Sequence, residues 1–169
     1  LDALAKSAHA RFKDSPIKLN ILIHGETGTG KESLAFEVAT RLGREKLYAR
    51  VNMSAVPATL FESTLFGHVK GSFSGATIET HGILLTHNGG AGFFDEMGEL
   101  PLDVQPKLLR FLENREVQQV GETKSKLVDD VVIIAATNRD LEPDKPLRKD
   151  LLARFEDRLE LPPLRERRE

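Results

Sequence analysis

The sequence lacks cysteine and tryptophan and contains a single tyrosine among its 169 residues. Without cysteine the chain has neither disulfides nor thiolate metal ligands, which fits a reducing, cytoplasmic setting. It has no long apolar run: the longest, Val131 to Ala136, is far shorter than the roughly 20 residues of a membrane span. An excess of one charge sign is missing too, since 24 basic and 26 acidic side chains give a net charge of −2. The overall charge therefore does not draw the chain to nucleic acid or to an anionic membrane.

Patterns of apolar residues typical of strands and of helices alternate along the sequence. Its 40% hydrophobic residues are enough for one sizeable core. We predict strands over residues 18–24, 47–52 and 131–137, one ending at 93–94, and helices over 1–12, 31–42, 58–66 and from Asp103 onward. Pro106 falls in the first turn of the last helix, where proline is tolerated, so Asp103 is the predicted N-cap. Residues 117–120 and 126–128 are predicted to form a β-hairpin. This order predicts a doubly wound parallel α/β sheet with its ligand site at the carboxyl ends of the strands.

A glycine-rich segment joins the first predicted strand to the next helix. It comprises Gly25, Glu26, Thr27, Gly28, Thr29, Gly30 and Lys31, followed by Glu32. Glycines let backbone N–H groups turn inward around a phosphate, the helix N-terminus adds positive potential, and Lys31 supplies a charge for the outer phosphates. Glu32 departs from the strict pattern, which has a serine or threonine there as a magnesium ligand. The alternative, a turn beside a surface lysine, is disfavoured by the strand before it and the helix after it.

Polar side chains end three of the predicted strands. Asp95 and Glu96 follow Phe93-Phe94, and in a nucleotide site the first holds magnesium and the second polarises the attacking water. Thr137 and Asn138 end the strongest strand and are placed to sense a γ-phosphate. Asn52, which closes the second strand, is a candidate for restraining Glu96. Ordinary strand caps remain the alternative for Asn52, Thr137 and Asn138.

Six stretches in the same order resemble one family, the AAA+ ATPase domain of bacterial sigma-54-dependent transcriptional activators. They are GETGTGKE (25–32), ESTLFGHVKGSFSGA (62–76), GGAGFFDEMGELP (89–101), QPKLLRFLENREVQQVGETK (105–124), VVIIAATNRDL (131–141) and LRKDLLARFEDRLELPPLRERRE (147–169). The resemblance implies a P-loop α/β fold with a parallel five-stranded sheet and helices on both faces. It also implies hexameric rings that hydrolyse ATP with Mg²⁺ and remodel the sigma-54 RNA polymerase closed complex. Glu32 fits this family, which carries glutamate after the phosphate-loop lysine.

The resemblance implies roles for individual residues. Lys31 would bind phosphates, Asp95 would hold magnesium, Glu96 would activate water, and Asn52 would switch Glu96 between poised and restrained states. Thr137 and Asn138 resemble the first sensor of the family. Arg148 and Arg154 fall where the family places arginine fingers, which reach the γ-phosphate of a neighbouring subunit. The alternative for both arginines is a solvated or ion-paired surface position, because residues 139–169 hold nine basic and nine acidic side chains.

The segment Gly71, Ser72, Phe73, Ser74, Gly75 and Ala76 resembles the family's remodelling loop, Gly-Ala-Phe-Thr-Gly-Ala, which contacts sigma-54. Ser72 and Ser74 depart from it, whereas Phe73 is retained. A large apolar ring between small residues suits a binding tip. The alternative is an ordinary loop whose Phe73 packs into the core.

The domain expectations follow from the same resemblance. We expect residues 1–169 to be one AAA+ nucleotide-binding subdomain that stops before the family's helical lid, and hence to be weakly active alone. DNA would be bound only through a domain missing from this chain. Alternatives are an AAA+ ATPase that remodels a different protein, or a nucleotide-dependent assembly module that no longer hydrolyses ATP. The sequence specifies neither the promoter nor the activating signal.

Overall fold

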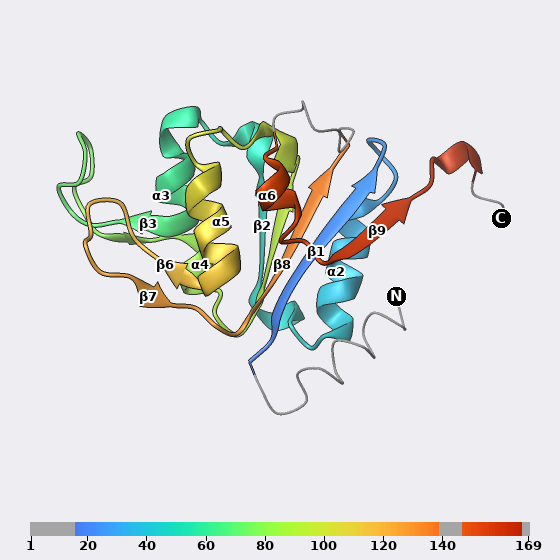
Figure 1. Ribbon diagram of the computed structural model, residues 1–169, viewed down its shortest axis with the longest axis horizontal. Helices are drawn as coiled ribbons and strands as arrows, with labels where there is room; N and C mark the ends of the chain where they lie inside the picture. The colour runs from blue at the N-terminus through green and yellow to red at the C-terminus, as the bar shows by residue number, and fades with distance from the viewer. Residues whose placement is uncertain (1–15, 139–146, 167–169) are drawn as a thin grey trace.

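The computed structural model describes residues 16–138 and 147–166, and within them the chain forms a three-layer α/β structure (Figure 1). Its central sheet has five strands in the order β2-β5-β8-β1-β9, and every neighbouring pair is parallel. The strands are β1 (Lys18–Gly25), β2 (Tyr48–Asn52), β5 (Ala91–Asp95), β8 (Val131–Thr137) and β9 (Asp157–Leu161). The predicted parallel five-stranded sheet is therefore confirmed.

Helices cover both faces of the sheet. One face carries α2 (Lys31–Arg41), and the other carries α3 (Phe61–Phe66), α4 (Ile83–Thr86), α5 (Gln105–Asn114) and α6 (Lys149–Leu152). Two short hairpins, β3 (Gly67–His68) with β4 (Thr80–His81) and β6 (Glu116–Val117) with β7 (Lys126–Leu127), lie beyond the second layer, far from α2 (Figure 1). The predicted helix over residues 1–12 lies outside the described residues.

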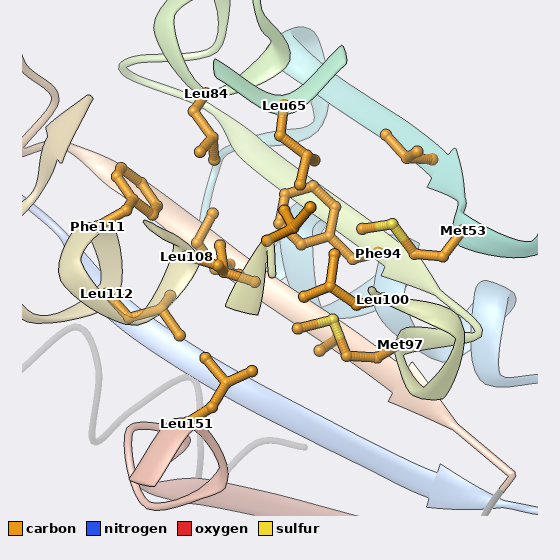
Figure 2. Close-up of a cluster of buried hydrophobic side chains, with 14 of the residues drawn as sticks. Met53, Leu65, Leu84, Phe94, Met97, Leu100, Leu108, Phe111, Leu112 and Leu151 are labelled. Carbon is orange, nitrogen blue, oxygen red and sulfur yellow. The ribbon is translucent and has the colours of Figure 1, made fainter. Parts of the chain in front are cut away.

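The core has two halves, one on each side of the sheet. Alternation along β5 places the fully buried Phe93 in the cluster beneath α2 and the fully buried Phe94 in the larger cluster beneath α3, α4 and α5. Figure 2 shows Phe94 surrounded by side chains from several elements, including Leu65, Leu84 and Leu108. Burying one such side chain is worth about 1.5–3 kcal/mol. The two phenylalanines thus fix β5, and with it the carboxylates at its end.

Several predicted boundaries shift by a few residues. Helix α5 begins at Gln105, and its N-cap is Val104 rather than Asp103. The carbonyl oxygen of Pro101 accepts hydrogen bonds from the N–H groups of both Val104 and Gln105, so the backbone turns there without a side-chain cap. Residues 58–60 form a 3₁₀ turn before α3, and the predicted hairpin over 117–128 is present but shorter.

Strand β9 was not located from the sequence. It lies beside β1 at the edge of the described sheet, and every side chain on it is at least partly exposed. Charged and apolar residues alternate along it, and such a pattern also suits a surface loop. Its position matters for the site, because Leu161 at its end pairs with Gly25 at the start of the glycine-rich segment.

Candidate functional site

The glycine-rich segment forms a tight loop between β1 and α2. Gly28 and Gly30 have φ values of 81° and 87°, a left-handed conformation that side chains disfavour. A Cβ on Gly25 would lie 2.9 Å from the carbonyl oxygen of Leu161, so glycine is also needed where the loop passes β9. The hydroxyl of the buried Thr29 donates to the carbonyl oxygen of Glu26 at 2.8 Å and holds the turn closed. The sequence thus specifies the loop through backbone geometry.

Lys31 begins α2, and its side chain folds back into this loop. It is 7% exposed, and its Nζ donates to the carbonyl oxygens of Gly25 at 2.9 Å and Glu26 at 3.0 Å. Both acceptors are neutral carbonyl groups, so they do not neutralise the charge of the ammonium. A phosphate group offers stronger, charge-assisted hydrogen bonds to the same ammonium.

The predicted phosphate-binding and acidic residues meet in one open, polar cleft of about 260 Å³. It is lined by Thr27, Gly28, Gly30, Lys31, Glu32, Ser33, Asp95 and Glu96. Glu96 adopts a left-handed conformation with φ of 54°, and its N–H donates to Asp95 Oδ1 at 3.0 Å. Such an unusual backbone conformation of a non-glycine residue is common at functional sites.

The other predicted strand-end residues do not line the cleft, and one of them, Asn138, contacts the glycine-rich loop. Asn138 Nδ2 donates to Thr27 Oγ1 at 3.1 Å and so links the end of β8 to the phosphate loop. Thr137 is buried beside it and pairs in register with His24 of β1. Asn52 pairs in register with Asp95, and its Oδ1 accepts hydrogen bonds from the backbone N–H and the hydroxyl of Ser54.

Of two neighbouring residues that line the cleft, Glu32 was predicted from the sequence and Ser33 was not. The carboxylate of Glu32 forms an ion pair with Arg50 of β2, which directs it toward the edge of the sheet. Ser33, one residue further along, lines the cleft and supplies a hydroxyl there. The sequence signal for Ser33 was present but displaced by one position from the strict pattern.

Arg165 is a second residue that sequence reasoning missed. It follows β9, and its guanidinium forms two hydrogen bonds, of 2.9 and 3.0 Å, to the carboxylate of Glu26 in the phosphate loop. This contact joins residues 139 positions apart, so no local pattern revealed it. The hydrogen bond from Arg165 holds the pKa of the exposed Glu26 carboxyl below its ordinary value of 4.5.

We expect Arg165→Ala to return the pKa of Glu26 toward 4.5, as measured by NMR titration of the side-chain carboxyl carbon. Because the folded-state pKa is lowered, the ion pair contributes above pH 4.5 and is lost as the pH falls through the lowered value. Glu122 is the internal control, since the backbone N–H groups of Thr123 and Lys124 lower its pKa. A Glu26 titration unchanged by the substitution would contradict the pairing.

The predicted arginine fingers are held by carboxylates of their own chain. Arg148 forms a bidentate contact with Asp150, and Arg154 Nη2 lies 2.6 Å from Glu113 Oε1. Both side chains are almost half exposed. Their backbones are also fixed: the N–H of Arg148 donates to Gln105 Oε1, and the carbonyl of Arg154 accepts from Asn20 Nδ2. Both guanidinium groups therefore lie at the surface, and each is paired with a carboxylate of its own chain.

The segment Gly71–Ala76 lies in the connection from β3 to β4, remote in sequence from the phosphate loop. Phe73 is 39% exposed and belongs to neither core cluster of the described chain, so the interpretation of this ring as a core residue is wrong.

In the described part of the chain, no helix has the length and apolarity to cross a membrane.

A glycine-rich loop after the first strand, with paired carboxylates at the end of β5 in a parallel five-stranded sheet, gives the chain an α/β fold of the P-loop AAA+ type. A family model described as the sigma-54 interaction domain matches residues 2–159. The chain belongs to that family.

Similar proteins agree with this assignment. The chain is 47% identical over 159 residues to the regulatory protein LuxO of Vibrio cholerae serotype O1, covering 91% of this chain and 30% of LuxO. It is 49% identical over 157 residues to the DNA-binding transcriptional activator HyfR of Escherichia coli (strain K12), covering 88% of this chain and 23% of HyfR. The chain thus spans about a third or less of the length of these relatives.

Solved structures show the same fold. NtrX from Brucella abortus in complex with ATP has a TM-score of 0.76 and 28% identity, covering 96% of this chain and 37% of NtrX. Hsp104 of S. cerevisiae in complex with ADP has a TM-score of 0.71 at 20% identity, over 98% of this chain and 33% of Hsp104, a likeness of fold alone.

Proposed function

We propose that this chain is the ATP-hydrolysing core of a sigma-54-dependent transcriptional activator. The observation that carries the proposal is that Lys31, Asp95 and Glu96 line one cleft in a member of the sigma-54 interaction family. The similarity to the regulatory protein LuxO, to the transcriptional activator HyfR and to the ATP complex of NtrX supports it.

In this proposal the phosphate loop binds ATP. Its backbone N–H groups and the N-terminus of α2 surround the phosphates, and Lys31 exchanges the two carbonyl oxygens for phosphate oxygens. Glu26, Thr27 and Thr29 shape the loop, and Ser33 adds a hydroxyl to the cleft. Arg165 neutralises Glu26, whose charge would otherwise repel the phosphates.

Asp95 would hold Mg²⁺ in this cleft. Within residues 16–138 and 147–166 no three histidine or acidic side chains gather to hold a metal by themselves, so phosphate oxygens would complete the ion's shell. When bound, the ion neutralises phosphate charge.

Glu96 polarises the attacking water and accepts its proton. Asn52, beside Asp95, restrains Glu96, while Thr137 and Asn138 sense the γ-phosphate through the contact of Asn138 with the loop.

Ring assembly would complete the site. Arg148 and Arg154 would exchange Asp150 and Glu113 for the γ-phosphate of a neighbouring subunit in a hexameric ring. Either Arg→Ala substitution is expected to abolish turnover while ATP affinity stays within about threefold, because a guanidinium acting on the transition state contributes little to ground-state binding. Paired ATPase and calorimetric titrations test this, and an equally large loss of affinity would place the arginine in its own subunit's pocket.

The experiment that tests the nucleotide site is a calorimetric titration with ATP and Mg²⁺. Lys31→Ala is expected to weaken ATP binding roughly tenfold or more, since a buried charge-assisted contact is lost. Lys46→Ala, at an exposed position in the 3₁₀ turn between α2 and β2 and away from the cleft, is the matched control. Equal affinities of the two variants would refute the phosphate-loop assignment.

The partner is tested with sigma-54 in the presence of ADP and aluminium fluoride, which together mimic the transition state. A nucleotide-dependent complex that Phe73→Ala abolishes supports both the partner and the loop. A chain that turns over ATP but forms no complex would show that the ATPase remodels a different protein.

A further inference from the structure

The Gly71–Ala76 loop is closed by hydrogen bonds of its own backbone. The N–H of Gly71 donates to the carbonyl oxygen of Ala76 at 2.8 Å, and the N–H of Ala76 donates to that of Phe73 at 3.0 Å. Gly71 and Gly75 have φ values of 82° and 101°, which allow these turns. Phe73 is therefore carried on a defined backbone.

The base of the loop is packed against the connection between β6 and β7. The N–H of Val69 donates to the carbonyl oxygen of Val120, and the N–H of Val120 donates to that of Gly67. A Cβ on Gly121 would lie 2.5 Å from the Cβ of Ser72, so the two segments pass so close that no side chain fits between them there. Figure 1 shows the two connections side by side, projecting from the α3–α5 layer. The loop is thus fixed at its base, and Phe73 extends beyond the fixed part.

Phe73 contacts the body of the domain through His68. The two ring centroids are 5.0 Å apart with an interplanar angle of 62°, an edge-to-face arrangement that aromatic pairs favour. His68 is 9% exposed, and its Nδ1 forms a 2.7 Å hydrogen bond with the hydroxyl of Ser63 in α3. Packing and this hydrogen bond therefore fix the histidine ring before Phe73 meets it.

We propose that His68 is a positioning residue that holds the Phe73 ring in a resting place, so that a partner must displace the ring from His68 to bind it. Only the identity of the partner in this inference rests on the proposed function. The contact between the two rings is a property of this chain.

The physical reason lies in how much of the ring is already covered. Binding anchors of this kind act by filling a pocket on the partner and losing all contact with water. With 39% of Phe73 exposed, more than half of its surface is covered by its own chain. An edge-to-face pair shifts an equilibrium by roughly 2- to 10-fold, so His68 lowers the affinity for the partner by that factor.

The contact is tested first without a partner. Because the chain has no tryptophan, Phe73→Trp introduces a single fluorescent indole at this position. In that background, His68→Ala is expected to increase acrylamide quenching of the indole about twofold, as the ring becomes accessible on both sides. His81→Ala, an exposed histidine on the paired strand β4, is the matched control, and His68→Phe is expected to restore the original quenching.

Ser63→Ala gives a second test that leaves both rings in place. It removes the hydrogen bond that orients His68, and we expect quenching between that of the Phe73→Trp reporter alone and that of the reporter with His68→Ala. Because the truncation is small, this variant keeps the proposal testable should His68→Ala fail to fold. Quenching unchanged in every folded variant overturns the proposal.

The consequence for the partner is tested with sigma-54, ADP and aluminium fluoride, using the chain with Phe73 intact. His68→Ala is expected to tighten the complex by roughly 2- to 10-fold, whereas His81→Ala leaves it unchanged. Weaker binding by His68→Ala would overturn the resting-place proposal, because it would mean that His68 helps to present the ring. If no variant binds sigma-54, the proposed partner fails, and the quenching series still decides whether His68 holds Phe73.

Discussion

Replacing Glu96 with glutamine is expected to reduce ATP turnover roughly 100-fold or more, because general-base catalysis contributes on the order of 10²- to 10⁴-fold. Glutamine keeps the size and hydrogen-bonding shape of the side chain but cannot accept the proton of the attacking water. The N–H of residue 96 still donates to Asp95, so the bend at the end of β5 is retained. ATP affinity should therefore stay within about threefold of the original value.

The measurement is a steady-state ATPase assay beside a calorimetric titration of the same preparation. Glu99→Gln, three residues further along the chain, is the matched control for loss of one negative charge at this end of β5. If Glu96→Gln abolishes binding as well as turnover, Glu96 has a role in forming the pocket, and another group activates the water.

The second large effect concerns stability. Gly82 precedes α4, and a Cβ there would overlap the backbone of three residues, Gly67 N, Leu65 O and Phe66 C. Backbone at the junction of α3 and β3 cannot move aside as a flexible side chain would. We expect Gly82→Ala to lower the free energy of unfolding by about 3 kcal/mol or more.

Gly92→Ala is the matched control and is expected to act in the opposite direction. Gly92 is also buried, but a Cβ there meets the Phe94 ring at 3.5 Å and Ile133 at 3.7 Å, which are ordinary packing distances. Removing a glycine from a strand is expected to stabilise the fold by about 0.5–1 kcal/mol. Urea denaturation of both variants measures the difference, and equal midpoints would mean that the packing around Gly82 relaxes freely.

The sequence alone predicted the strands that are buried on both faces. Continuous apolar runs such as Ile21–Ile23 and Val131–Ala136 have one stable location, the interior of a parallel sheet, so β1 and β8 were placed within a residue of their ends. Strand β9 was missed because its alternating charged and apolar residues suit an edge strand and a loop equally well. The prediction of Asp103 as the N-cap of α5 was wrong because a backbone turn at Pro101 takes the place of a side-chain cap. Local amino-acid composition does not indicate such a turn.

In the candidate site, too, some of the residues that come together were predicted from the sequence and others were not. Lys31 and Asp95 lie at or shortly after strand ends, and parallel strands bring their carboxyl ends to one edge, so the sequence order already implied that they would line one cleft. The contacts of Arg165 with Glu26 and of Phe73 with His68 depend on tertiary structure and were not foreseen. The roles of Arg148 and Arg154 in ring assembly stay predictions.

The strand order has a consequence for how the protein is made. Strand β1 is the first strand of the sheet to leave the ribosome, yet both of its neighbours, β8 and β9, come more than 100 residues later. Strands β2 and β5 pair with each other much sooner. Long-range parallel pairing forms slowly, and the glycine-rich loop starts where β1 meets the end of β9. During synthesis, the glycine-rich loop is therefore expected to gain its final surroundings last, after the rest of the sheet is in place.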